Sequence, residues 1–327
     1  MKRDLIHFEP QSIFFHTDSV YSRYQDKTFY AHMFLEDLGT SIIPIGGRRY
    51  TGKPFSVSIS PFEQQHKTKI NLLFPSEFHS YDRLYSTMEE TVSGFIEDCA
   101  KRLVVRGTQH YEIVPASINP EMGKENLNLS EPVFVLINIS GRVLKLGGAY
   151  IQFIPKNLWK KVNKKFVILP ASSVWQVSIP RKIGGTRSIE EILKGLFIAG
   201  GKYRAEMKIL EEGISKKGTF DVNSYYRNAE SYVAWLTRSW GWDIRTSLQR
   251  YSLEYYQIYR RIVSAYTLAV FRELIFEDMN SLLSRIGYGC QMKMDGLPAS
   301  FNISEIFSKL ENKEISFKEA YDLTNIQ

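Results

Sequence analysis

The feature that most limits how this chain can fold is a long stretch, residues 252–286, that contains neither Pro nor Gly. Its apolar residues recur three or four positions apart, which places them on one face of a helix: Tyr255, Ile258, Ile262, Tyr266, Ala269, Val270, Leu274, Met279 and Leu282. At about 1.5 Å per residue, such a helix is on the order of 50 Å long. A helix of that length lines or spans something, so the sequence favours a structural or binding protein over an enzyme.

The composition is that of an ordinary folded protein. The 327 residues are 43% hydrophobic, 13% aromatic and 24% charged, which is enough to bury one large or two ordinary cores. The two cysteines, Cys99 and Cys290, are too few and too far apart for a disulfide framework or a zinc site. We expect a soluble protein, because the sequence shows no secretory signal and no run of about 18 apolar residues.

The net charge of +7 comes from one part of the chain. Residues 140–220 contain 16 Lys and Arg against 5 Asp and Glu, whereas residues 1–139 contain 14 against 17. Basic segments of this kind attract polyanions through counterion release. The candidate nucleic-acid contacts are five lysines around Trp159 and three residues further along the chain: Lys156, Lys160, Lys161, Lys164, Lys165, Arg181, Lys182 and Arg187. The alternative is a hairpin tip whose lysines face only water.

Short segments rich in β-branched and aromatic residues predict strands in the first half of the chain. They cover residues 55–60, 67–74, 110–114, 133–139, 142–146, 149–154, 165–169 and 174–179. Between them, Thr87 and Glu90 form a capping box that opens a helix ending at Arg106. The carboxylates of this helix are predicted on its exposed side: Glu89, Glu90, Glu97 and Asp98.

The second half is predicted to be mainly helical. A capping box of Ser188 with Glu191 predicts a helix from 189 to about 212, and the turn after it marks the expected domain boundary. The fold class is therefore α+β, with a mixed domain over 1–220 and a helical region over 221–327. Two short helices are expected at the end of the chain, capped by Asn302 with Glu305 and by Ser316 with Glu319.

Three tryptophans in the helical region have two interpretations. Trp235, Trp240 and Trp242 could form a platform on which bases stack, but aromatic residues at helical spacing belong to a core or an interface in most proteins. We therefore favour packing.

No arrangement of residues predicts catalysis. The six histidines lack the spacing of a metal site, and no Gly-rich segment has the P-loop or dinucleotide-binding pattern. We predict a protein that is not an enzyme and that needs no cofactor and no metal. An enzyme whose site is built from residues far apart in the sequence stays open, and its candidate carboxylates are Glu112, Asp221, Asp243 and Asp295.

The order of these elements resembles the portal proteins of tailed bacteriophages. The similar segments lie within about residues 87–327 and are a helix followed by RGTQHYEIV, then LPASSVWQVSIP, the helix containing IGGTRSIEEILKGLFIAGGKYRAEM, the long helix, MKMDGLPASF and IFSKLENKEISFKEAYDL. In that family a helix leads into a strand of the wing, and a long helix lines the channel. The last motif departs from the family at Lys313, where a Gly is common, and at Tyr321, where an Arg is common.

The resemblance implies a wing-like domain and a helical stem, assembled into a ring through which double-stranded DNA passes during packaging and ejection. It also implies a dodecamer in the virion that contacts the terminase large subunit, an adaptor or head-completion protein, and capsid or scaffold protein. We expect the ring to form through residues 188–212 and 251–286, because helices of this kind cannot bury both faces within one chain. The alternative function is an accessory protein that binds nucleic acid as a monomer or dimer, for example in a phage-defence system.

Overall fold

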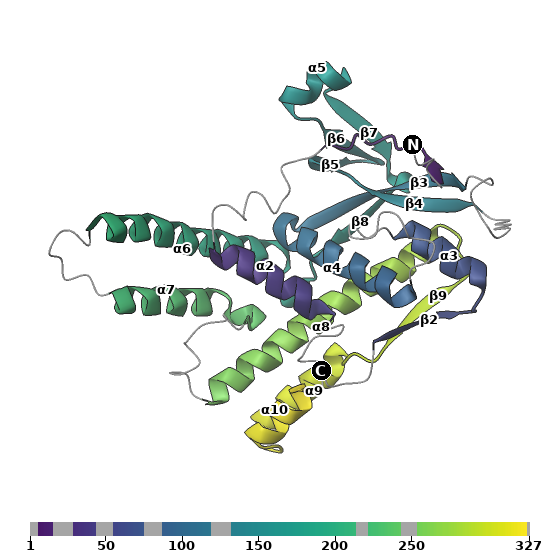
Figure 1. The fold of residues 1–327 in the computed structure, drawn as a ribbon. Coiled ribbons are helices and arrows are strands. Elements are labelled where there is room, and N and C mark those ends of the chain that lie inside the picture. Colours follow the sequence, from purple (N-terminus) through teal and green to yellow (C-terminus); the bar gives the residue numbers. More distant parts are fainter. Residues whose placement is uncertain are drawn as a thin grey trace.

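The computed structural model describes residues 6–15, 29–43, 55–74, 87–118, 132–213, 222–242 and 254–325. Over these residues the fold is mixed α+β with small antiparallel sheets, which confirms the predicted class (Figure 1). The elements are β1 (Ile6–Phe8), α2 (Phe29–Ile42), β2 (Ser56–Ser60), α3 (Gln64–Leu73), α4 (Met88–Arg106), β3 (Thr108–Ile118), β4 (Val133–Asn138), β5 (Arg142–Leu146), β6 (Ala149–Phe153), η1 (Lys156–Leu158), α5 (Trp159–Val162), β7 (Phe166–Pro170), η2 (Ala171–Ser173), β8 (Val174–Ser178), η3 (Arg181–Ile183), α6 (Gly185–Gly213), α7 (Val222–Leu236), η4 (Arg238–Trp240), α8 (Glu254–Arg285), β9 (Gln291–Asp295), α9 (Ser300–Glu311) and α10 (Phe317–Asn325).

Helix α4 has the boundaries that its sequence predicts. The Thr87 hydroxyl accepts a hydrogen bond from the Glu90 N–H, and the Glu90 carboxylate accepts one from the Thr87 N–H, which completes the capping box. Gly107 ends the helix in the left-handed conformation, with φ of 73°. A Cβ on this glycine would lie 2.0 Å from Cγ2 of Thr186, so the approach of α6 requires a glycine as well.

The large sheet is built around β3 and contains β1, β4 and β8. Strand β4 pairs along one edge of β3, while β8 and β1 pair with the two ends of its other edge. One face of this sheet packs against helix α4, where Phe95 stacks on Trp175 of β8 and contacts Tyr111 of β3. All three side chains are buried and belong to the main hydrophobic core.

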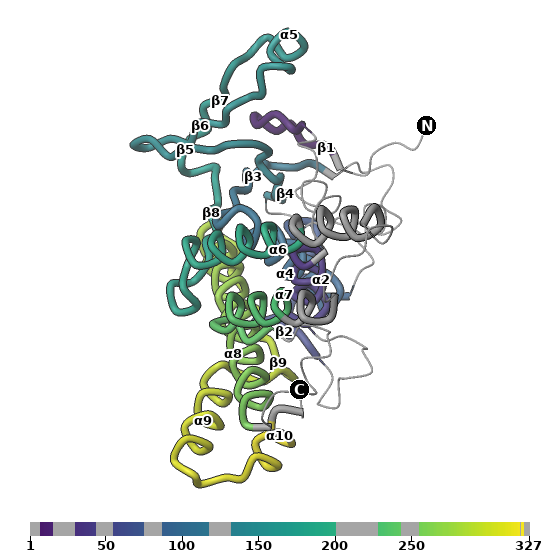
Figure 2. The backbone as a smooth tube through the Cα atoms, turned by 90° about the vertical axis from the view of Figure 1, so that its left-hand side faces the viewer, coloured from purple at the N-terminus to yellow at the C-terminus, as the bar shows by residue number. Residues whose placement is uncertain are grey.

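The small sheet, β5–β6–β7, lies on the other side of the large sheet (Figure 2). The Tyr150 hydroxyl of β6 donates to Gln176 of β8 at 3.0 Å, and the Tyr150 ring meets the His110 ring of β3 edge-on at 5.5 Å. The hydrophobic cluster beneath the small sheet includes Tyr150, Val167 and Leu169. This part of the fold is therefore layered as helices, large sheet and small sheet.

One predicted strand is wrong. Residues 67–74 belong to helix α3 and its C-cap, because the helix begins at Gln64, before the apolar run, and is buried on nearly all sides. Polar residues of this segment, including Thr68 and Lys69, are buried together with Ile70, Leu72 and Leu73, so the sequence pattern did not show a helix with one polar face. The remaining predicted strands appear as β2 to β8, each within two residues of the expected ends except for the longer β3.

The long helix is confirmed as α8, although residues 251–253 lie outside the described part of the chain. The expectation that it leaves a face uncovered is wrong for most of its length. Its first half packs with α9 and α10 through Ile258 and Ile262, and its second half lies in the main core through Phe271 and Met279. The chain itself therefore covers most of α8.

Two predicted helix starts are also wrong. Helix α6 begins at Gly185, so Ser188 lies inside its first turn and does not cap it. Helix α9 begins at Ser300, before Asn302. Its first turn is bound by Glu273 of α8, whose carboxylate accepts from the Ser300 N–H and from the Ser300 hydroxyl, each at 2.6 Å. A cap supplied by a distant helix leaves no local sequence signal. The predicted capping box of α10, Ser316 with Glu319, is confirmed.

Helices α6 and α7 form an antiparallel pair that extends away from the sheets (Figure 1). The two helices approach closely at Gly195, where a Cβ would lie 2.3 Å from a Leu236 methyl. The turn that marks the predicted domain boundary includes residues 214–221, which lie outside the described part of the chain. The main core contains residues from both predicted domains, for example Leu196 and Phe271.

The carboxylates of α4 do not all face water as predicted. Glu90 is exposed, but Glu89 is half-buried and accepts from the Val57 N–H at 3.0 Å. The Asp98 side chain is 13% exposed, and burial raises its pKa to about 6 although Arg102 lies 3.5 Å away. Burial raises the pKa of Glu97 as well. The helical periodicity of the sequence places these residues on the side of α4 away from the main core. Other elements pack against part of that side and bury some of them.

Candidate nucleic-acid interface

The lysine cluster forms a projection between β6 and β7, made of η1 and α5. The tip is anchored by Trp159, whose Nε1 donates to the Ile154 carbonyl at 2.7 Å and whose ring lies 5.2 Å from Lys165 Nζ. Leu158 and Val162 pack against the cluster beneath the small sheet. We call residues 156–165 the lysine tip. Because its apolar residues turn inward, the tip presents charge and not apolar surface.

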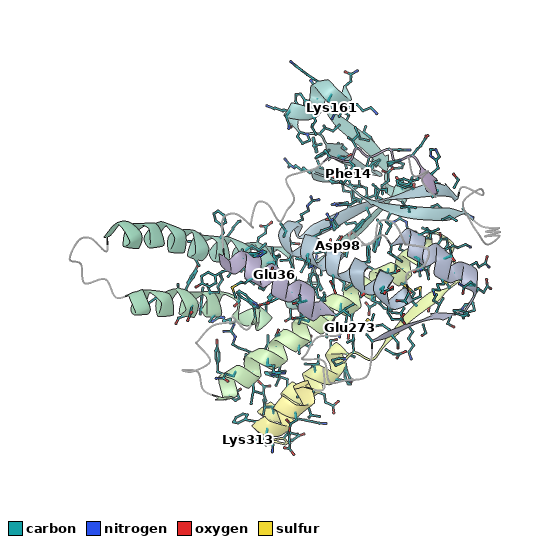
Figure 3. All side chains as sticks on the ribbon, in the orientation of Figure 1. Phe14, Glu36, Asp98, Lys161, Glu273 and Lys313 are labelled. Atoms are coloured by element: carbon teal, nitrogen blue, oxygen red, sulfur yellow. The ribbon has the colours of Figure 1, made fainter. Side chains whose placement is uncertain are left out.

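All five lysines of the tip are exposed, and Figure 3 places Lys161 at its far end. The sequence from 140 to 189 contains ten basic residues and no Asp or Glu. Carboxylates of the same segment therefore cannot neutralise the tip, and its field acts on whatever approaches. The lysine tip is therefore a small, positively charged projection.

The second basic group does not join the first. Arg181 and Lys182 are exposed in η3, and Arg187 lies in the first turn of α6, where its Nε is 3.3 Å from a Glu191 carboxylate oxygen. Both views place α5 at the far end of the small sheet from α6 (Figures 1 and 2). The eight candidate residues therefore form two separate surfaces.

The tryptophans behave mainly as packing residues. Trp240 and Trp242 are buried against Phe34, and Trp242 Nε1 donates to Asp37 at 2.9 Å. Trp235 differs, because its side chain is 57% exposed, with Tyr232 stacked beside it and the Arg238 guanidinium 5.4 Å from its ring centroid. The packing interpretation is confirmed for the two buried rings.

The carboxylates considered for a distant-residue active site are not brought together where they are described. Glu112 is buried in β3 and accepts from the backbone N–H groups of Gln11 and Ser12, at 2.9 and 2.8 Å. Asp295 lies on β9 in a different sheet and pairs with Lys293. Asp221 and Asp243 lie outside the described residues.

No cluster of three or more His, Cys, Asp or Glu side chains has the arrangement needed to hold a metal ion in the described ranges. No described helix combines the length and apolar character needed to cross a membrane.

Sequence reasoning missed an apolar surface on the small sheet, next to the lysine tip. Its exposed residues are Leu144, Leu146, Phe153, Phe166 and Ile168. Strand β7 is apolar at every position, so alternation could not show which set of side chains is buried. The absence of Asp and Glu from residues 140–189 was the only sequence signal that set this region apart.

The chain was also compared with known proteins. No protein-family model, no curated protein and no solved structure matches it.

Proposed function

We propose that this chain is the subunit of a portal-like ring, a structural protein that gives passage to double-stranded DNA during phage packaging and ejection. The observation that carries the proposal is the exposed apolar surface on helices α6 and α7. Phe197 and Ile198 of α6 and Tyr232 and Trp235 of α7 are all exposed. Large exposed apolar side chains on two paired helices are a feature of surfaces that other proteins cover.

Self-association in a closed ring covers such a surface without a second kind of protein. When one face of a subunit packs against a different face of the next copy, the contacts close into a ring if the rotation between copies allows it. The α6–α7 pair extends from the body, so it can reach a neighbouring copy. The order of α4, β3, β8, α6, α8, β9, α9 and α10 supports the portal resemblance.

In this ring, DNA is held by shape and backbone charge. Contacts between lysines and phosphates carry no base information, so they allow DNA of any sequence to slide. The proposal includes a place in the virion and contacts with a terminase large subunit, an adaptor or head-completion protein, and capsid or scaffold protein. It includes no catalytic step and no cofactor.

Mass measurement tests the ring. We expect light scattering and negative-stain images to show a large cyclic oligomer, and the double variant Ile198→Glu with Trp235→Glu to reduce it to small species. Phe301→Glu is the control, because Phe301 is exposed as well, at 74%, but lies on α9. A wild-type protein that stays monomeric at high concentration, with and without scaffold or capsid protein, would contradict the proposal.

The lysine tip favours a second candidate, an accessory protein that binds nucleic acid as a monomer or dimer. Replacing Lys160, Lys161, Lys164 and Lys165 by Glu should weaken binding to every DNA sequence tested. It should also flatten the dependence on salt, by about 0.9 in the log–log slope for each lost phosphate contact. The same number of charge changes at Lys309, Lys313, Lys318 and Lys293 is the control. Tight binding by a monomer that is lost in the tip variant favours this candidate over the ring.

A further inference from the structure

The small sheet presents one face to the outside along its whole width. In the register of β5, β6 and β7, residues directly opposite one another share a face. We call the outward set the open face, and it consists of Arg142, Leu144, Leu146, Ala149, Ile151, Phe153, Phe166, Ile168 and Pro170. The inward residues of β6 and β7, including Tyr150, Gln152 and Leu169, are buried, whereas Lys145 on the edge strand β5 is exposed. Most of the outward residues are apolar as well, whereas the uncovered face of an antiparallel sheet is usually polar.

Two aromatic rings and a guanidinium form one row across this face. Phe153 pairs with Phe166 on one side and with Arg142 on the other, so the row crosses all three strands. Phe153 is 40% exposed and Phe166 is 52% exposed, while the Arg142 guanidinium lies 5.9 Å from the Phe153 ring centroid. Phe153 and Phe166 therefore come from neighbouring strands, whose backbones are about 4.8 Å apart.

The row lies where the small sheet meets the lysine tip. Phe153 is the last residue of β6 and Phe166 the first of β7, and residues 156–165 connect them. Aromatic rings therefore adjoin five exposed lysines in a segment without a single carboxylate. A ligand that is complementary to this surface carries negative charges at regular intervals next to flat apolar rings.

We propose that the open face binds single-stranded nucleic acid, with bases stacked on Phe153 and Phe166 and phosphates held by Arg142 and the lysine tip. Stacking on aromatic side chains of an antiparallel sheet is a general way to bind unpaired bases, because every base has a flat π face. Bases inside a duplex are already stacked on each other, so the open face selects single strands. The site does not depend on ring formation.

The shape of the region favours this ligand over a membrane surface. A protein that inserts into lipid places apolar side chains at its protruding end, but here that end carries lysines and Trp159 is turned inward. The apolar residues lie on the flat side of the sheet instead.

Fluorescence anisotropy with a labelled 12-nucleotide oligo(dT) tests the proposal. We expect salt-dependent binding that exceeds binding to a duplex of the same length. The double variant Phe153→Ala with Phe166→Ala should lose at least about 30-fold in affinity. The double variant with Tyr at both positions should keep most of it, because Tyr also stacks. Leu146→Ala, on the same face but outside the row, should change affinity less than 3-fold, and urea unfolding checks that each variant is folded.

Several outcomes would contradict the proposal that the open face binds single-stranded nucleic acid. These are the absence of oligo(dT) binding at low salt, equal affinity in the double Ala variant, and tighter binding to the duplex. Binding of phosphatidylserine vesicles that is lost in the Ala variant, without oligo(dT) binding, would assign the face to lipid. Each of these can occur whether or not the protein forms rings, so failure of this proposal and failure of the ring are separate results.

Discussion

The two larger sheets of this protein are both rich in apolar and aromatic residues but differ in what covers them. The large sheet around β3 packs one face on α4, where Phe95, Tyr111 and Trp175 are buried together. The small sheet buries its inward face, yet its outward face carries Phe166 and Ile168 in the open. Similar residues are therefore core in one sheet and surface in the other. The difference lies in the layer above each sheet and not in the strands.

The sharpest test of this contrast removes one phenylalanine from each region. Phe95→Ala should lower the free energy of unfolding by about 3–5 kcal/mol, because it leaves a cavity among closely packed rings. Phe166→Ala, the matched change on the open face, should alter it by less than about 0.5 kcal/mol. Urea unfolding followed by circular dichroism measures both. Equal losses would mean that the open face is covered within the chain.

The second prediction tests whether a substitution on the inward face of the small sheet lowers the free energy of unfolding as much as one in a hydrophobic core. Gln152 is fully buried, and its side-chain amide donates to the carbonyls of Ile13 and Ser140 and accepts from the Ile13 N–H. Gln152→Leu leaves one buried and two part-buried backbone groups without their Gln152 partner and should cost about 2–4 kcal/mol in unfolding free energy. Gln291→Leu, at an exposed strand position, is the control. A cost near zero would show that water enters beneath this sheet.

The third prediction concerns the contact between the two sheets, where His110 meets Tyr150. Burial, with a smaller contribution from Arg106, lowers the pKa of His110 from 6.5 to about 4. As the pH falls from 6.5 towards 4, His110 becomes protonated in the unfolded chain but stays neutral in the folded protein. The free energy of unfolding therefore decreases over that pH range. The loss should be about 1 kcal/mol for this half-buried ring.

The variant His110→Phe should lack this part of the acid sensitivity. Comparing the two proteins at each pH separates His110 from Asp98, whose raised pKa acts in the opposite direction between 3.8 and about 6. Identical slopes of unfolding free energy against pH in the two proteins would show that water reaches the ring between the sheets.

The smallest effect on stability is expected for the aliphatic part of the open face. Leu146→Ser should change the free energy of unfolding by less than about 0.5 kcal/mol, since the side chain is exposed at the turn between β5 and β6. It should raise the concentration at which the protein begins to aggregate, because it reduces the exposed apolar surface. Turbidity against concentration measures this, with Ser172→Ala as a surface control.

Local patterns predicted much of the fold because their causes are local. The capping boxes of α4 and α10 and the turn glycine after α4 act through neighbouring residues, and the structure confirms them. The start of α9 was mispredicted because its cap comes from Glu273 on another helix. Helix α3 was mispredicted because residues from elsewhere bury nearly all of its sides.

In the candidate interface as well, the sequence predicted the features with local causes and missed those that depend on distant residues. Charge counting identified the lysine tip, since charge is a property of composition. It could not show that Arg187 lies on a separate surface, or that Phe153 and Phe166 are exposed side by side, since both depend on how β6 and β7 pair and on what covers them. Strands that are apolar at every position hide which side faces out.

The pairing of β2 with β9 has a consequence for how the protein is made. Ser56 pairs with Asp295, so a strand near the start of the chain finds its partner only near the end. At translation rates of about 5–20 residues per second, the ribosome needs roughly 10–50 s to synthesise the intervening chain. During that interval the early strand emerges without its partner, at a stage when unpaired strand edges are prone to aggregation. Chaperone binding to nascent chains should therefore concentrate before residue 295 has left the exit tunnel and fall once β9 is free to pair.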